Sequence, residues 1–380
     1  GVQSLSGILS PKLIGSFVLL GLFPLLARWS VDRFKARRVY KKWKKPKRYD
    51  RNLVVIGAGS AGLVSAYIAA TVRAKVTLIE SGTMGGDCLN TGCVPSKALI
   101  RSARLLADAR RGRAFGLADS ELKFDFADVM QRIQRVIGEV APHDSPQRYR
   151  AMGVDVRHGQ AKITTPWTVE VDGESIATRA IVIAAGAEPL VPPVDGLDRI
   201  DYLTSENVWG LRELPRRLVV LGGGPIGCEL AQAFARFGAQ VTQVELVERL
   251  LLREDDDVSA FVRTRLEADD VRVLTGHKAV AVGNDGDEKV LLCEHGDEKV
   301  RLPFDAILVA VGRKPRTAGY GLEELGIALT KTKTIETDAW LQTLYPNIYA
   351  CGDVAGPYQF THTAAHQAWY ASVNALFGQF

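Results

Sequence analysis

The sequence predicts an α/β fold with two Rossmann-like dinucleotide-binding domains and an apolar helix near the N-terminus. Two observations lead to this prediction: a glycine-rich turn between an apolar strand and a helix occurs twice, and an acidic residue follows each turn at the same spacing. The length agrees, because 380 residues with 47% apolar side chains can bury two or three domain cores. We therefore expect an enzyme-sized protein that binds two dinucleotides.

The first unit begins with the apolar run 53–56, continues through the turn GAGSAG at 57–62 and then a helical stretch, and a second strand ends at Glu80. Gly57 permits the tight turn, Gly59 lets the backbone approach a pyrophosphate, and Gly62 lets the helix pack closely on the strand. A carboxylate at the end of the second strand can hold the ribose hydroxyls of an adenosine. The candidate nucleotide-binding residues are Gly57, Gly59, Ser60, Ala61, Gly62 and Glu80.

The second unit repeats this pattern downstream. The apolar run 218–221 leads into GGGPIG at 222–227, a helix follows through about residue 237, and a further strand ends at Glu245. One such turn is weak evidence, but two turns with an acid at equal spacing are strong evidence. The candidate residues here are Gly222, Gly224, Pro225, Ile226, Gly227 and Glu245.

Glu245 also bears on the choice of nicotinamide cofactor. Its carboxylate can accept hydrogen bonds from a free 2′-hydroxyl but repels a 2′-phosphate, so NAD is favoured over NADP. Arg249 and Arg253 lie close by in the sequence and weaken that preference.

Two cysteines, Cys88 and Cys93, lie in the run GGDCLNTGCVPSK at residues 85–97. With four residues between them they are close enough for a strained disulfide, and a redox-active dithiol beside a flavin is the favoured interpretation. Half of a zinc site and two buried structural thiols are the alternatives. Zinc needs further ligands, yet the other three cysteines are isolated and no histidine falls three to five residues from any cysteine, so no metal site is expected. Five cysteines are too few for a secreted disulfide scaffold, which indicates a reducing compartment.

The N-terminal part has an apolar stretch at residues 13–27 followed by a basic segment. Residues 28–51 contain 12 lysines and arginines against two aspartates, whereas residues 52–380 carry a net charge of −6. Positive charge beside an apolar helix marks the cytoplasmic side of a membrane anchor, so we predict a transmembrane helix, a location at the cell membrane and a catalytic part that faces the cytoplasm. A buried core helix and the last helix of a larger membrane domain remain alternatives. The position of the basic segment argues against nucleic acid as the partner.

Residues 52–380 resemble the pyridine nucleotide-disulfide oxidoreductases, the class I family that contains dihydrolipoamide dehydrogenase, mercuric reductase and glutathione reductase. The resemblance rests on several motifs in the family's order. They are GAGSAG, GGDCLNTGCVPSK, AAGAEP at 184–189, GGGPIG followed by Cys228 and Glu229, VAVGRKP at 309–315 and YACGDV at 349–354.

The resemblance implies roles for individual residues. Cys93 would lie against the flavin and accept its electrons, and Cys88 would attack the substrate. Lys97 would lie near flavin N5, paired with Glu229. A helix beginning near residue 94, or a nearby cation, should lower the pKa of Cys93. The remaining residues implied in cofactor binding are Gly85, Gly86, Gly186, Gly312, Gly352 and Asp353, with Asp353 on the ribityl chain.

The chain departs from the family in two respects. Many relatives have threonine where this chain has Asp87, and a carboxylate beside Cys88 would disfavour the thiolate of Cys88 unless it is hydrogen-bonded elsewhere. The family's C-terminal dimerisation domain, which supplies a catalytic His-Glu pair, does not follow residue 353, so a homodimer is expected only of a full-length form. His362 and His366 do not match that pair in position, and we assign neither as the base.

The resemblance implies a split flavin domain with the nicotinamide domain inserted in it. The expected boundaries are 1–51 for the anchor helix and basic linker, 52–205 and 315–380 for the two parts of the FAD domain, and 206–314 for the NAD domain. Antiparallel strands are expected near 154–156 and 168–171, a similar meander at 271–302, and a helix at 125–140.

The leading functional hypothesis is an enzyme that passes hydride from NADH or NADPH through FAD to a Cys88–Cys93 disulfide. From there the electrons would reach a small-molecule disulfide, thiol or metal-thiolate substrate. A membrane-associated NADH dehydrogenase that reduces quinone is the first alternative, but it would not need the two thiols. A truncated, redox-responsive flavin-binding module is the second alternative.

Overall fold

The first nucleotide unit forms a parallel sheet in the computed structural model, which describes residues 11–116, 118 and 122–378. The strands lie in the order β3-β2-β1-β6, and β16 pairs with β6 as well. Their bounds are β1 Arg51–Ile56, β2 Val76–Glu80, β3 Asp155–His158, β6 Glu174–Ile183 and β16 Ile348–Ala350. Because β16 follows only after the whole second unit, segments from both parts of the chain complete one sheet.

The long strand β6 also belongs to an antiparallel layer with β4 (Ala161–Thr165) and β5 (Thr168–Val171). The two-residue turn between β5 and β6, at Asp172 and Gly173, has positive φ at both positions, 51° and 79°. The prediction of an antiparallel strand at residues 154–156 was wrong, because β3 pairs parallel with β2. Alternating apolar residues do not fix strand direction, and the long helical segment before β3 provides the crossover that a parallel pair needs.

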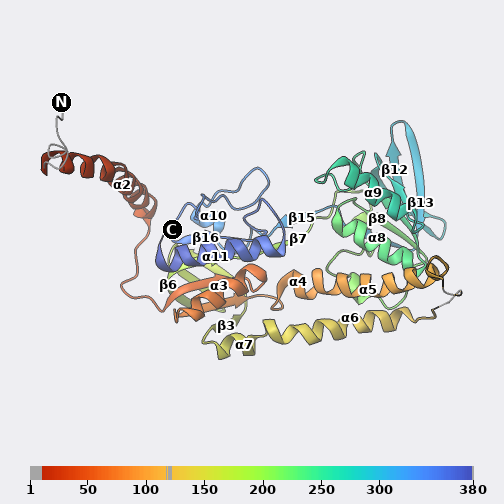
Figure 1. The fold of residues 1–380 in the computed structure, drawn as a ribbon, viewed down its shortest axis with the longest axis horizontal. Coiled ribbons are helices and arrows are strands. Elements are labelled where there is room, and N and C mark those ends of the chain that lie inside the picture. Colours follow the sequence, from red (N-terminus) through yellow and green to blue (C-terminus); the bar gives the residue numbers. More distant parts are fainter. Residues whose placement is uncertain (1–10, 117, 119–121, 379–380) are drawn as a thin grey trace.

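Two helices, α3 (Ser60–Thr71) and α11 (Thr361–Phe377), pack together against this parallel sheet (Figure 1). Their contact is made largely by small side chains, which let the two helix backbones approach closely. The buried alanines are Ala61, Ala66 and Ala69 of α3 and Ala364, Ala368 and Ala371 of α11. The N-termini of both helices are thereby held close to the carboxyl ends of β1 and β16.

A helical excursion leaves the first unit between β2 and β3. It consists of α4 (Gly86–Asn90), α5 (Cys93–Arg110), α6 (Phe126–Val140) and α7 (Pro146–Ala151). The helix predicted at 125–140 is confirmed as α6, whose first turn is capped by Asp125, since Oδ1 accepts a hydrogen bond of 2.8 Å from the amide of Ala127. The helices α5 and α6 run side by side toward the second unit (Figure 1).

The second unit is another parallel sheet, with strand order β10-β9-β8-β14. The strands are β8 Arg217–Leu221, β9 Gln240–Val244, β10 Arg272–Leu274 and β14 Ala306–Val309, and its helices are α8 Pro225–Phe237 and α9 Asp256–Glu267. An antiparallel meander packs on it, formed by β11 Lys278–Asp285, β12 Glu288–His295 and β13 Glu298–Phe304. The prediction of a meander at 271–302 therefore placed its start too early, because the first of these residues form β10 in the parallel sheet.

The excursion helices share one hydrophobic core with the second unit. Leu99 of α5 and Met130 of α6 are fully buried with Phe234 of α8, and the ring of Phe126 lies 6.0 Å from that of Phe234. A short ladder between β7 (Ala187–Pro189) and β15 (Arg313–Pro315) joins the two crossings of the chain between the units. The small helix α10 (Leu322–Leu325) lies beyond the second crossing.

The helix α2 (Pro11–Val39) extends away from both units (Figure 1). Among the described residues, none of the helices combines the length and the apolar character that crossing a membrane requires. The predicted transmembrane anchor is therefore not supported. The apolar run 13–27 is shorter than the roughly 20 residues that a bilayer core needs.

Candidate active site

The first glycine-rich turn has the close backbone contacts that its sequence predicts. Gly57 has φ of +98°, and a Cβ there would lie 2.3 Å from the carbonyl oxygen of Ala184. A Cβ on Gly62 would lie 1.7 Å from the carbonyl oxygen of Gly57. Only glycine fits at either place, so the strand, the turn and the start of α3 are held in one compact arrangement that presents free backbone amides.

The second turn reproduces this geometry. Gly222 has φ of +111°, and a Cβ there would lie 2.4 Å from the carbonyl oxygen of Ala310. A Cβ on Gly227 would lie 2.2 Å from the carbonyl oxygen of Gly222. The helix α8 begins at Pro225. Proline has no backbone N–H, but an N–H in the first turn would have no partner within the helix, and the fixed φ of proline suits this position.

The two predicted acids occupy equivalent positions. Glu80 accepts hydrogen bonds from the amides of Ala58 (2.6 Å) and Gly82 (2.7 Å). Glu245 accepts hydrogen bonds from the corresponding amides, those of Gly223 and of Val247 (3.0 Å). Each carboxylate is thereby fixed at the end of its second strand, beside the glycine-rich turn, where a ribose hydroxyl can reach it.

The dithiol segment packs directly on the first turn. A Cβ on Gly86 would lie 2.6 Å from the Cα of Gly59, so the predicted residues Gly85 and Gly86 line the same place as the phosphate turn. Cys88 lies in α4, and Cys93 is the first residue of α5. Cys88 is half-buried and Cys93 is exposed, and both thiols are free in this structure.

The two thiols differ in acidity. The pKa of Cys93 is lowered from 9.0 to about 5, because the Cys88 thiol donates a hydrogen bond to the Cys93 sulfur, with further help from Thr361 and from the charge of Lys97. The pKa of Cys88 is raised, because its proton is held in that same bond and because the side chain is partly buried. The Oγ1 of Thr361, at the start of α11, lies 3.5 Å from the Cys93 sulfur. The reduced pair is therefore a Cys93 thiolate and a Cys88 thiol.

Lys97 and Glu229 are paired, as the sequence led us to expect. The Lys97 Nζ lies 2.6 Å from Oε2 and 2.7 Å from Oε1 of Glu229. Lys97 is one turn along α5 from Cys93, and Glu229 comes from α8. The pair thus links the dithiol helix to the first helix of the second unit.

Asp87, the departure from the family pattern, has a cationic partner. Arg313 donates a hydrogen bond to the Asp87 carboxylate and another of 2.8 Å to the carbonyl oxygen of Ala187. The Nε of Arg313 also lies 3.7 Å from Oδ2 of Asp353. Burial raises the pKa of Asp353, which the charge of Arg313 partly offsets. The Asp87 charge beside Cys88 is therefore balanced by an arginine.

The remaining predicted residues flank the same region. Gly352 has φ of +78°, and a Cβ there would lie 3.2 Å from the Cβ of Ala61 in the first turn of α3, which brings Asp353 to the nucleotide turn. Gly186 and Gly312 flank the β7–β15 ladder: the carbonyl oxygen of Gly186 accepts from Arg316, and that of Gly312 accepts from Leu190.

The contributions of two residues to the site, Thr361 and Arg313, were not predicted from the sequence. Thr361 and the role of Arg313 depend on contacts with residues more than two hundred positions away in the sequence, and no local pattern reports such contacts.

The residues present fit an FAD in the first unit and a nicotinamide dinucleotide in the second. In each unit the glycine positions leave a cradle that any Cβ would fill, and an acid stands at the ribose position. The first unit alone adds Asp353, a mostly buried carboxylate whose pKa is raised by that burial and which a ribityl hydroxyl could satisfy. The dithiol lies at the first cradle, and the Lys97–Glu229 pair lies where the two units meet.

Comparison with known proteins agrees with this geometry. Residues 51–368 match the family model described as pyridine nucleotide-disulphide oxidoreductase. The chain is 34% identical over 330 residues to a mercuric reductase of Bacillus cereus, covering 87% of this chain and 52% of that protein. It is 35% identical over 329 residues to a dihydrolipoyl dehydrogenase of Bacillus subtilis, covering 85% of this chain and 71% of that protein.

A solved structure is similar as well. The HOCl-induced flavoprotein disulfide reductase RclA from Escherichia coli superposes with a TM-score of 0.75 at 30% sequence identity, covering 87% of this chain and 72% of that chain. The chain spans about half the length of the Bacillus cereus mercuric reductase.

The acidity of Cys93 predicts a pH dependence of alkylation. In the reduced protein, we expect the rate of Cys93 carboxamidomethylation by iodoacetamide to rise through about pH 5 and to stay level at neutral pH, because only the thiolate reacts. In Cys88→Ala the hydrogen-bond donor is lost, and the midpoint should move toward the ordinary value of 9.0. Mass spectrometry of the modified peptide gives the rate, and an unchanged midpoint in Cys88→Ala would contradict the assigned donor.

The Arg313 cluster predicts a pH-dependent stability. Arg313→Gln leaves two carboxylates facing each other, so we expect it to cost about 2–3 kcal/mol in the free energy of unfolding, more than Asp87→Asn. Without Arg313 the folded-state pKa of Asp353 rises further above its unfolded value, so the cost should grow as the pH rises and shrink as it falls.

Urea unfolding at about pH 8 and about pH 5 measures this dependence. A cost that is the same at both pH values would show that the three charges do not interact. Adding Asp87→Asn to Arg313→Gln should recover part of the loss, because one of the two facing carboxylates is then neutral.

Proposed function

Because the chain belongs to the pyridine nucleotide-disulphide oxidoreductase family, we propose that it transfers electrons from NADH to a thiol-reactive acceptor through the Cys88–Cys93 pair. The family consists of FAD-containing, NAD(P)H-dependent disulfide oxidoreductases. The observation that carries the proposal is the thiol–thiolate pair packed against the first nucleotide turn, with the Cys93 pKa lowered to about 5.

The chain's own residues supply the thiol chemistry. FAD, when bound, supplies the two-electron relay between the nicotinamide and the dithiol. In the reduced pair Cys93 holds the negative charge and Cys88 holds the proton. Cys88 attacks an acceptor disulfide and its proton passes to the leaving sulfur, which forms a mixed disulfide and releases one thiol. The Cys93 thiolate then attacks the Cys88 sulfur, which releases the second sulfur as a thiolate and restores the Cys88–Cys93 disulfide.

The other residues of the site orient the dithiol and adjust its charge. Thr361 and Lys97 favour the Cys93 thiolate. The Lys97–Glu229 pair holds that cation in place while it ties α5 to α8. Arg313 balances the charge of Asp87, the neighbour of Cys88 in the chain.

NADH is the proposed donor, because the second unit places a carboxylate at the ribose position and the nearby Arg249 is held by contacts within its own loop. Glu245 stands at the ribose position. Arg249 pairs with Asp256 and donates to the carbonyl oxygens of Leu252 and Glu254, at 3.0 and 3.1 Å, so its guanidinium is engaged by its own loop. A 2′-phosphate would meet the carboxylate of Glu245, and the guanidinium of Arg249 is held by other contacts.

A disulfide or a metal thiolate is the proposed acceptor class. The names of the relatives, a mercuric reductase, a dihydrolipoyl dehydrogenase and a flavoprotein disulfide reductase, support a thiol-based acceptor. Quinone reduction is disfavoured, since it would give no role to the acidic Cys93 and its hydrogen-bonded partner.

An anaerobic titration of the flavin-loaded protein with NADH tests the relay. We expect a long-wavelength absorbance band from charge transfer between the Cys93 thiolate and the flavin, and we expect Cys93→Ser to abolish it. In Cys88→Ser no disulfide can form, so Cys93 stays a thiolate and the band should be present before NADH is added.

Cys293→Ser, a buried cysteine of the meander, is the matched control and should behave as the parent protein. NADPH should reduce the protein more slowly than NADH. Complete flavin reduction with no band, unaffected by Cys93→Ser, would reject the dithiol relay and favour quinone reduction. No response to either nucleotide would favour a flavin-binding module without turnover.

A further inference from the structure

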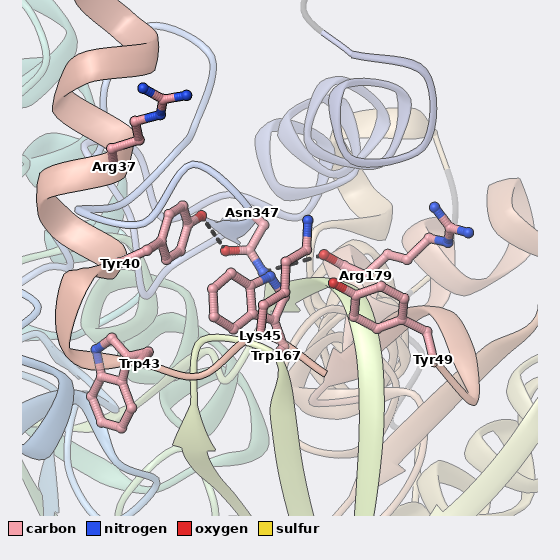
Figure 2. Close-up of a pocket in the computed structure, with 8 residues that line it drawn as sticks. All are labelled: Arg37, Tyr40, Trp43, Lys45, Tyr49, Trp167, Arg179 and Asn347. Carbon is pink, nitrogen blue, oxygen red and sulfur yellow. Dashed lines mark hydrogen bonds between the residues drawn. The ribbon is translucent and has the colours of Figure 1, made fainter. Parts of the chain in front are cut away.

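A cavity of about 600 Å³ lies between the end of α2 with the segment that follows it and the outer layer of the first unit (Figure 2). Its lining is aromatic and basic. The residues are Arg37, Tyr40, Trp43, Lys45, Tyr49, Trp167, Arg179 and Asn347. None of these residues belongs to either nucleotide turn or to the dithiol segment, so the cavity needs an explanation of its own.

Specific side-chain contacts hold the walls of the cavity in place. The hydroxyl of Tyr40 donates to Asn347 Oδ1 at 2.6 Å, and the ring of Tyr40 stacks on Trp167 with 4.6 Å between centroids (Figure 2). The indole of Trp43 donates to the hydroxyl of Tyr345 at 2.9 Å. Tyr40 and Trp43 therefore fasten the segment after α2 to the body of the first unit.

Positive charge dominates the cavity. Arg37, Lys45 and Arg179 line it, and no acidic side chain does. In the described part of the chain, no carboxylate lies within ion-pair distance of any of the three, and Arg179 lies over the ring of Tyr49 at 5.4 Å. Guanidinium and ammonium groups beside aromatic rings suit a phosphate whose organic part rests on the rings.

The neighbouring helix indicates where such a phosphate would come from. α2 exposes large apolar side chains over residues 14–26, among them Phe17 (64% exposed) and Leu19 (71%). Residues 37–48, at the C-terminal end of α2 and just beyond it, contain eight lysines and arginines and no acid. Apolar side chains next to clustered cations are the features of a segment that enters an anionic lipid surface and keeps its charges at the headgroups.

We propose that this cavity binds the phosphate headgroup of an anionic lipid while the apolar part of α2 enters the lipid surface beside it. The cavity thereby orients the protein on the membrane through a contact made without spanning it. The proposal does not depend on the dithiol chemistry. It states how the chain would contact the membrane at which the sequence predicts it to be located.

Vesicle sedimentation with the whole chain tests the proposal. The vesicles are phosphatidylcholine alone and phosphatidylcholine with about one-fifth phosphatidylglycerol. The cavity variant is Lys45→Ala with Arg179→Ala. The matched control is Lys44→Ala with Lys47→Ala, which removes the same charge from exposed positions of the same segment outside the cavity. Thermal unfolding of both variants checks that they fold.

We expect binding to the anionic vesicles only, and a loss of affinity that is about tenfold greater in the cavity variant than in the control. Equal losses in the two variants would overturn the cavity as a headgroup site, since diffuse charge alone would then explain binding. Equal binding to neutral vesicles would overturn the role of the phosphate.

Trp43 and Trp167 give a second readout. Soluble glycerophosphoglycerol should change the tryptophan fluorescence of the parent protein and of the control, and not that of the cavity variant. If inorganic phosphate gave the same change and no vesicle bound, the cavity would be a free-anion site, and the lipid assignment would be wrong. Binding of a single-stranded oligonucleotide in place of vesicles would also overturn it.

Discussion

The packing of α5 against α8 is the interaction on which the rest of the structure depends. The two helices share a core with α6, in which Leu99, Met130 and Phe234 are fully buried. The Lys97–Glu229 pair adds a polar contact at the same place. Because Cys93 is the first residue of α5, the core that joins the two units also fixes the position of the dithiol. A fold that separated the units would separate the proposed nicotinamide site from the dithiol.

The two glycine-rich turns meet the same steric requirement. In each unit the helix must start so close to the strand that a Cβ would meet a carbonyl oxygen, at 1.7 Å for Gly62 and 2.2 Å for Gly227. This closeness leaves the backbone amides free for a pyrophosphate. The units differ in what surrounds the cradle: the dithiol and Asp353 lie at the first only. That difference supports the proposed placement of the flavin in the first unit and of the nicotinamide in the second.

Local sequence patterns predicted what depends on local physics. The glycine turns, the acids that follow them and the helix α6 depend on steric rules and residue periodicity within short segments. The direction of β3 and the assignment of β10 to the parallel sheet were not predictable, because they depend on which strand lies alongside. Arg313 illustrates the same limit: its motif was visible, but its partner Asp87 is 226 residues away.

In the proposed relay, electrons from NADH arrive at Cys88 and Cys93. The most direct measurement is a count of thiols that react with a thiol reagent after NADH is added anaerobically to the oxidised, flavin-loaded protein. We expect about two new reactive thiols per chain, absent from Cys93→Ser and unchanged in Cys293→Ser. Consumption of NADH with a reduced flavin and no new thiol would contradict it.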